Sequence, residues 1–225
     1  MRWGIIYALL SIFVLSIVSY FFSGDIIDFL TKPVDRLIFI KPLEAFMTRI
    51  KISIATGGAV AMPFVLFLLW HFVSPALHTK EKKPLILGVF FSTLFFLGGI
   101  SFAHFVVVPI GMKFLLSFAT ENLEPMISIG SYLSFVIRMF FAFGFVFQLP
   151  IFSYFLTKMG IIKPDTLKKN RRIGIIVLII ISALLTPPDI FSQFLMAVPM
   201  LLLYEFSIFV SMIAAKPNKK KKSDN

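Results

Sequence analysis

The sequence predicts an all-α polytopic membrane protein with six transmembrane helices. Of its 225 residues, 58% are hydrophobic and 29 are phenylalanine, whereas soluble domains contain roughly 45–50% apolar residues. Runs of about 20 apolar residues, the length that crosses a hydrocarbon core as a helix, recur along the whole chain. A soluble protein could not cover that much apolar surface. We therefore expect residues 1–225 to form a single integral membrane domain.

The six predicted spans follow one another along the chain. They are residues 4–22, 52–73, 85–108, 132–156, 173–185 and 194–213. The first has the length of a signal peptide, but no small-residue cleavage site follows it, so it is expected to stay as a span. The stretch "DIIDFL" after it predicts a short interfacial helix that Pro33 ends.

The fifth predicted span is unusually short. Its 13 apolar residues reach only ~20 Å at ~1.5 Å per residue. A hydrocarbon core is ~30 Å thick and usually takes ~20 residues to cross. A helix of this length would oblige the bilayer to become thinner beside it, although residues of the following "TPPDIFSQ" turn could restore part of the length.

Lysine and arginine are distributed unevenly between the loops. Fifteen lie at Arg2, in residues 80–83 and 158–172, and in the tail 214–225, against six in the alternate loops. The positive-inside rule therefore places both termini in the cytoplasm. This pattern also accounts for the net charge of +11, so no nucleic-acid partner is expected. The basic tail is expected to be disordered and to meet anionic lipid heads.

Polar side chains inside the apolar runs are costly and are often functional. Gln148 lies in the middle of the fourth span, where a helix–helix hydrogen bond explains it equally well. Glu205 interrupts the sixth span and must pair, protonate or face water. Arg138 is expected to extend toward the outer interface. These three residues keep an ion-coupled secondary transporter open as an alternative function, and a scaffold without a transport role is a second one.

Signatures of enzymes and metal sites are absent from the sequence. The chain has no Gly-x-Ser-x-Gly elbow and no His-Glu-x-x-His motif. Its three histidines lack the spacing of a metal site, and it contains no cysteine. We therefore expect neither catalysis nor a cofactor.

Three stretches together resemble the TatC subunit of the twin-arginine protein translocase. They are "HFVSPALHTKEKK" (71–83), "GSYLSFVIRMFFAFGFVFQLPIF" (130–152) and "LLTPPDIFSQFLMAVPMLLLYE" (184–205). The resemblance implies a cupped bundle with short fifth and sixth helices in the inner (cytoplasmic) membrane. It also implies that the chain recognises twin-arginine signal peptides and exports folded proteins with the proton-motive force. The implied partners are TatA- and TatB-type single-span subunits, other copies of the chain and the lipid bilayer.

The resemblance assigns signal-peptide binding to Phe72 and Glu81. Glu81 is the only acid among the lysines of residues 80–83, so it suits a bidentate contact with arginine. The alternative is a weak local salt bridge to those lysines. Arg2 matches only the end of a His-x-x-Glu-Leu-Arg segment that TatC carries before its first span. Either translation starts upstream, or Glu81 binds the signal nearly alone.

The resemblance gives six further residues a role. Gln148 matches a Glu or Gln on the concave side, open to lipid heads, water or a signal-peptide backbone. Thr186 and Gln193 match the cluster where TatA or TatB docks. Asp189 matches an acid after the double proline, and it is also placed to cap the next helix. Pro33 and Glu205 match a first-loop proline and a sixth-span acid.

Overall fold

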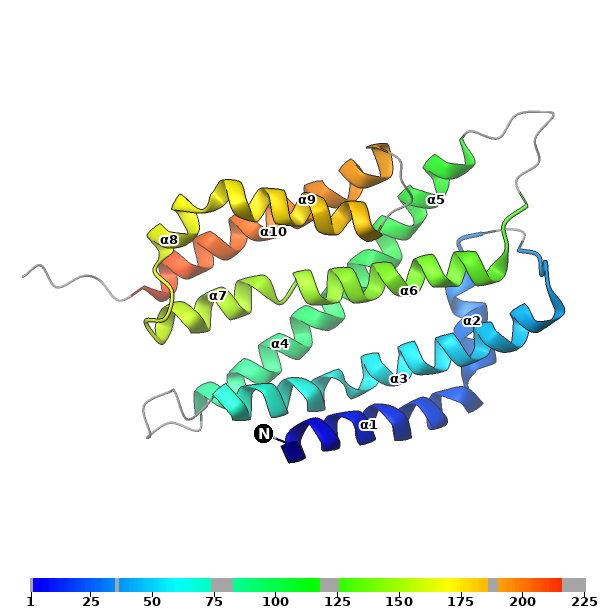
Figure 1. Cartoon of the computed structure of the whole chain (residues 1–225), viewed down its shortest axis with the longest axis horizontal. Helices are drawn as coiled ribbons and strands as arrows, with labels where there is room; N and C mark the ends of the chain where they lie inside the picture. The colour runs from blue at the N-terminus through cyan, green and yellow to red at the C-terminus, as the bar shows by residue number, and fades with distance from the viewer. Residues whose placement is uncertain (1, 35–36, 74–82, 118–125, 186–189, 216–225) are drawn as a thin grey trace, which may run out of the picture.

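The computed structural model describes residues 2–34, 37–73, 83–117, 126–185 and 190–215, without the side chains of residues 2–3, 72–73, 83–85 and 190–192. Within these ranges the chain is almost entirely helical (Figure 1). The elements are α1 (Arg2–Phe21), α2 (Ser23–Thr31), α3 (Pro42–Val73), α4 (Lys83–Phe102), the π-helix η2 (Ala103–Val107), α5 (Val108–Leu116), α6 (Ile129–Val146), α7 (Leu149–Lys158), α8 (Pro164–Lys169), α9 (Arg171–Leu185) and α10 (Ile190–Ala214).

The six predicted spans correspond to α1, α3, α4 with η2 and α5, α6 with α7, α9, and α10. Five of these are long and apolar enough to cross a membrane. The remaining one, α9, is the fifth span along the chain. It has 15 residues, or about 22 Å at ~1.5 Å per residue. The predicted short fifth span is therefore present. The predicted short helix is confirmed as α2, which ends at Thr31, just before Pro33; its interfacial position stays a prediction.

Several helices extend beyond the predicted apolar runs. α3 begins at Pro42, well before residue 52, because polar residues such as Glu44 and Arg49 continue the helix outside the apolar stretch. The third span continues past Pro109 to Leu116 through the π-turn η2, an arrangement that accommodates the missing proline N–H. The expected short sixth helix is corrected: α10 has 25 residues, because the polar residues before position 194 are already helical.

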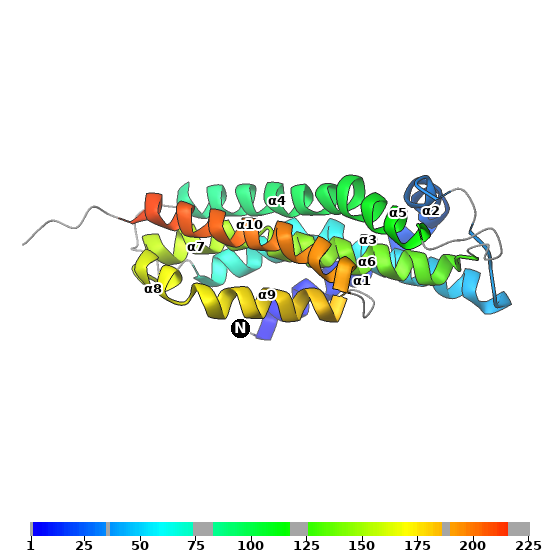
Figure 2. The same cartoon turned by 90° about the horizontal axis from the view of Figure 1, so that it is seen from above.

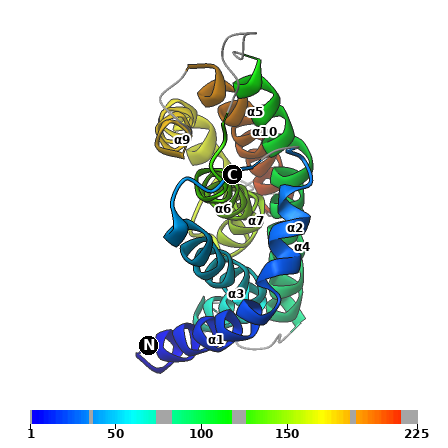
Figure 3. The same ribbon diagram turned by 90° about the vertical axis from the view of Figure 1, so that its right-hand side faces the viewer.

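The helices form a curved wall rather than a closed bundle. Seen end-on in Figure 3, α1, α3, α6 and α9 lie along its inner side, and α4, α5 and α10 lie along its outer side. Figure 2 agrees, with α1 and α9 on one side of the molecule and α4 and α10 on the other. The larger buried core surrounds α6, whose Val136, Met139 and Phe143 are fully enclosed.

Glycine decides how closely α1 approaches α3. A Cβ on Gly57 would lie 2.4 Å from the backbone nitrogen of Ser16, so only glycine permits this contact. The "ATGGAV" stretch in α3 is thus a small-residue packing surface, as small residues commonly are between membrane helices.

Candidate functional site

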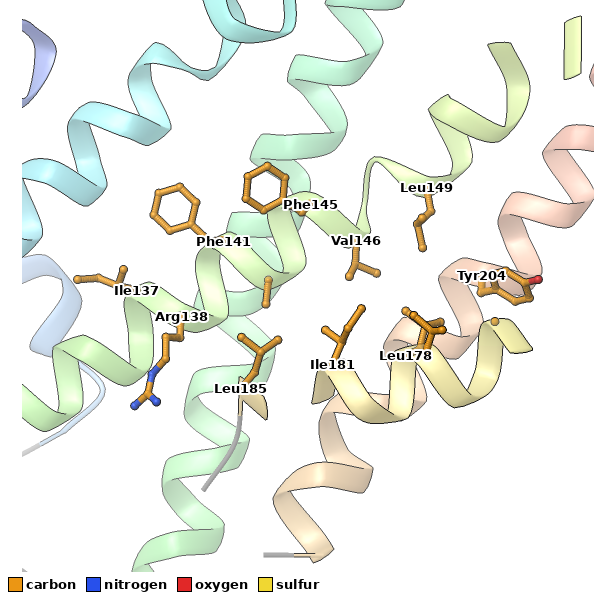
Figure 4. Close-up of a pocket in the computed structure, with 13 residues that line it drawn as sticks. Ile137, Arg138, Phe141, Phe145, Val146, Leu149, Leu178, Ile181, Leu185 and Tyr204 are labelled. Carbon is orange, nitrogen blue, oxygen red and sulfur yellow. The ribbon is translucent and has the colours of Figure 1, made fainter. Parts of the chain in front are cut away.

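The inner side of the wall carries three shallow apolar grooves. The largest, about 610 Å³, lies between α6 and α9 and ends at Tyr204 of α10. In Figure 4, Leu178, Ile181 and Leu185 of α9 point toward α6, and Arg138 lies at the Leu185 end. A second groove of about 440 Å³ lies between α3 and α6. A third, of about 500 Å³, lies between α1 and α3. Together they form a continuous apolar face.

An ion pair marks the other end of the α6–α9 groove. Arg171, the first residue of α9, donates a hydrogen bond from a guanidinium nitrogen to a carboxylate oxygen of Glu205, at 2.8 Å. The sequence left three options for Glu205, and the structure selects pairing. Both side chains are nearly half exposed, so the pair contributes little to stability. The pair places charged groups beside the start of α9, where the apolar part of that helix begins.

Gln148 lies at the break between α6 and α7, which Pro150 helps to create. Its side-chain amide donates to the backbone oxygen of Ser92 in α4, at 3.0 Å. The hydroxyl of Ser92 in turn accepts a hydrogen bond from the indole N–H of Trp70 in α3, at 2.9 Å. Gln148 is only 2% exposed, so it does not face lipid heads or water as the resemblance implied. The break turns it toward α4, where it joins helices.

The sequence did not predict a cluster of hydrogen bonds around one carboxylate, that of Glu44, at the opposite end of the wall. Glu44, in the first turn of α3, accepts hydrogen bonds from the backbone N–H groups of Ile40 and Gly130, at 2.8 and 2.9 Å. The hydroxyl of Ser128 also donates to it. Because Gly130 lies in the first turn of α6, Glu44 supplies negative charge to the start of a second helix. No local motif pairs Glu44 with residues 128–130, so only the fold reveals the cluster.

The three residues proposed for ion coupling do not converge. Arg138 bonds to the backbone oxygen of Ser134, Gln148 to that of Ser92, and Glu205 to Arg171. Within the described part of the chain, no group of three His, Cys, Asp or Glu side chains could hold a metal ion. This geometry gives no support to the transporter alternative.

Comparison with known proteins decides the family. The family model described as "Sec-independent protein translocase protein (TatC)" matches residues 1–199. The chain belongs to the TatC family.

TatC relatives match most of the chain. The TatC protein of Carboxydothermus hydrogenoformans is 41% identical over 216 residues, which cover 94% of this chain and 89% of that protein. The TatC protein of Aquifex aeolicus is 36% identical over 230 residues, covering 97% and 94%. A crystal structure titled "Twin Arginine Translocase Receptor- TatC" superposes with a TM-score of 0.88 at 36% identity, covering 95% and 96%. The chain is therefore a multi-pass component of the Sec-independent translocase, which works with other Tat subunits and is not an enzyme.

The structure describes only some of the residues that the resemblance assigned to the site. Glu81, Thr186 and Asp189 lie outside the described residues, and Phe72 and Arg2 are described only as helical backbone, at the end of α3 and the start of α1. Pro33 is exposed directly after α2.

Of the two predicted docking residues, the structure describes Gln193. Its side-chain amide lies 3.4 Å from the backbone oxygen of Ile179 in α9. The contact joins the two helices of the predicted docking edge through one long hydrogen bond.

Proposed function

We propose that the chain is the signal-recognition subunit of a twin-arginine translocase in the cytoplasmic membrane. It binds twin-arginine signal peptides through the 72–83 region and assembles with single-span partners. Together they export folded proteins at the expense of the proton-motive force, with both termini of this chain in the cytoplasm. Membership of the TatC family supports this role, as does the similar crystal structure, whose title describes a twin-arginine translocase receptor.

The observation that carries the mechanism is the length of α9. Its 15 residues begin at the Arg171–Glu205 pair and end at Leu185. The whole helix is about 22 Å long, which is shorter than a ~30 Å hydrocarbon core, so lipid beside α9 must become thinner. A thinned bilayer lowers the barrier that a folded cargo meets. The long neighbour α10 does not remove this mismatch, because α9 is the one that lines the inner face.

The signal peptide is proposed to meet Glu81 through its arginine pair. An arginine–carboxylate contact is bidentate and charge-assisted, and removal of one partner of a desolvated pair costs a few kcal/mol. Phe72, at the end of α3, is proposed to pack against the apolar part of the signal beside this contact.

Crosslinking tests the recognition site. With photoreactive residues placed along 72–83, a twin-arginine precursor is expected to crosslink in the native chain and to lose most of its crosslinks in Glu81→Arg. Asp165→Arg is the matched control, because it makes the same charge change in the other basic segment predicted to be cytoplasmic, at the start of α8. Equal crosslinking of the Glu81→Arg variant and the native chain would remove Glu81 from the site.

A further inference from the structure

Two cations meet on the inner face of the wall, at the place where two of its apolar grooves join. We propose that Lys51 and Arg138 bind the headgroup of one anionic phospholipid, whose two acyl chains lie in the grooves on either side of α6. This inference concerns lipid binding alone and does not depend on signal recognition.

The two cations converge on one residue of α6. The ammonium group of Lys51, from α3, lies 3.3 Å from the hydroxyl of Ser134. The Nε of Arg138 donates to the backbone oxygen of the same Ser134, at 3.2 Å. Both side chains are exposed, and the Arg171–Glu205 pair is the only salt bridge among the described residues. No carboxylate in the described part of the chain therefore neutralises these two charges.

The level of this pair matches the boundary of the hydrocarbon. Lys51 directly precedes the apolar stretch 52–73 of α3. Arg138 turns back along α6 toward Ser134, as a cation in an apolar stretch does to reach the interface. Leu185, the last residue of α9, lines the same groove as Arg138. Residues of three helices, α3, α6 and α9, thus lie at the same boundary of the hydrocarbon. A cation without a counter-ion at this depth is costly unless an anion binds it.

The grooves supply space for two chains. The groove between α6 and α9 and the groove between α3 and α6 share Ile137, Arg138 and Phe141. Apart from the polar groups at this shared rim, both linings are almost wholly apolar. Two open apolar grooves that meet at two cations complement a molecule with two hydrocarbon tails and one negative headgroup. An apolar protein helix would fill one groove and leave both cations unpaired.

The geometry also favours a phosphate over a simple ion. The guanidinium of Arg138 uses only Nε within the described chain, which leaves its remaining N–H groups for a phosphate oxygen. The ammonium of Lys51 adds a second donor from the other side of Ser134. Two cations at a membrane surface favour an anionic headgroup over a zwitterionic one.

Lipid binding to the purified full chain, measured by native mass spectrometry, tests the headgroup. The native chain is expected to bind phosphatidylglycerol in preference to zwitterionic phosphatidylcholine, and inorganic phosphate is expected not to compete. Lys51→Gln with Arg138→Gln should weaken phosphatidylglycerol binding about thirtyfold, or about 2 kcal/mol for two contacts. The matched control is Lys41→Gln with Lys113→Gln, which removes two exposed cations that line neither groove.

A second variant tests the position of the chains. Val177 is 47% exposed and lines the α6–α9 groove, so Val177→Trp should fill it. This variant is expected to weaken binding of phosphatidylglycerol but not of its single-chain lyso form, which needs one groove. Ile176→Trp is the control, because Ile176 is 56% exposed and does not line the groove.

Three results would overturn the proposal. One is equal phosphatidylglycerol binding by the native chain and the Lys51→Gln, Arg138→Gln variant. Another is equal binding of phosphatidylcholine and phosphatidylglycerol by the native chain. The third is loss of a co-purifying partner helix, rather than of lipid, in that double variant, which would make the face a protein-docking surface.

Discussion

Individual polar side chains join segments that are distant in the sequence. Ser92 connects α3 and α4 to the α6–α7 break by accepting from Trp70 at its hydroxyl and from Gln148 at its carbonyl. Glu44 joins the start of α3 to the start of α6. Buried polar groups need such partners, because an unpaired donor in an apolar interior costs free energy.

The hydroxyl of Ser92 gives a prediction at the residue scale. Ser92→Ala removes the acceptor of the buried Trp70 N–H, so we expect a loss of about 1–2 kcal/mol in the free energy of unfolding. Tryptophan fluorescence during thermal unfolding in detergent measures it. Ser101→Ala, at an exposed position of the same helix, should leave the midpoint unchanged. An equal shift in both variants would mean that the hydrogen bond contributes nothing specific.

At the scale of elements, the edges of the wall differ in how they are held. α1 lies at one edge and packs on α3 through Gly57. α9 lies on the inner side at the other edge and is held mainly by α10. Apolar helices gain little from association in lipid, because lipid tails solvate them equally well. Close backbone approach and sparse hydrogen bonds therefore determine these contacts.

Alanine substitutions at two adjacent glycines distinguish the effect of close helix packing from the general effect of alanine on helix stability. Gly57→Ala places a Cβ 2.4 Å from the Ser16 backbone, so α1 must move, and a destabilisation of about 1–3 kcal/mol is expected. Gly58→Ala makes an ordinary 3.5 Å contact with Phe141, and it should be neutral or slightly stabilising. Unfolding midpoints of the two variants compare them directly. The packing argument fails if Gly58→Ala is the more damaging change.

The α9–α10 edge is proposed to receive a single-span partner. Thr186 and Gln193 flank the turn, and membrane hydrogen bonds average ~0.6 kcal/mol with a maximum of ~1.7. Loss of both, in Thr186→Val with Gln193→Leu, should lower partner co-purification several-fold, whereas Thr93→Val on α4 should not. Cysteines placed along 183–196 of this cysteine-free chain should form disulfides with the partner's span. If these cysteines do not crosslink, while single cysteines placed on α1, α3 or α4 do, the docking edge lies elsewhere.

The whole molecule combines an open curved wall with one short helix. The apolar grooves between α1 and α9 are open, and the short α9 limits the thickness of hydrocarbon that this face can match. Lys51, Arg138 and the end of α9 lie at one boundary of this face, and the Arg171–Glu205 pair lies at the other. The inner face therefore offers lipid a shorter apolar path than the long outer helices do.

Orientation in the membrane is a prediction for the whole chain. The distribution of lysine and arginine places both termini in the cytoplasm. A reporter active only after export should be inactive when fused after Asn225 and active when inserted within residues 118–125. Activity of the Asn225 fusion would reverse the proposed topology and move the 72–83 region away from cytoplasmic signal peptides.

The sequence by itself determined the number of spans, the short α9 and the short helix α2 before Pro33. These depend on local hydrophobic length and on proline, which act within one helix. The likeness of its motifs to TatC also identified the family. The starts of α3 and α10 were not predicted, because polar residues that continue a helix outside the apolar run carry no hydropathy signal. The end of the third span was not predicted because the helix continues past Pro109 through the π-turn η2.

Only the tertiary structure decided which way the polar residues face. Gln148 was expected on the concave side, but the break at Pro150 turns it toward Ser92 of α4. For Glu205 the sequence allowed pairing, protonation or contact with water, and the structure shows it paired with Arg171 at 2.8 Å. The Glu44 cluster and the Lys51–Arg138 pair each join residues more than 80 positions apart. Such contacts arise from the packing of whole helices, and no local sequence pattern contains that information.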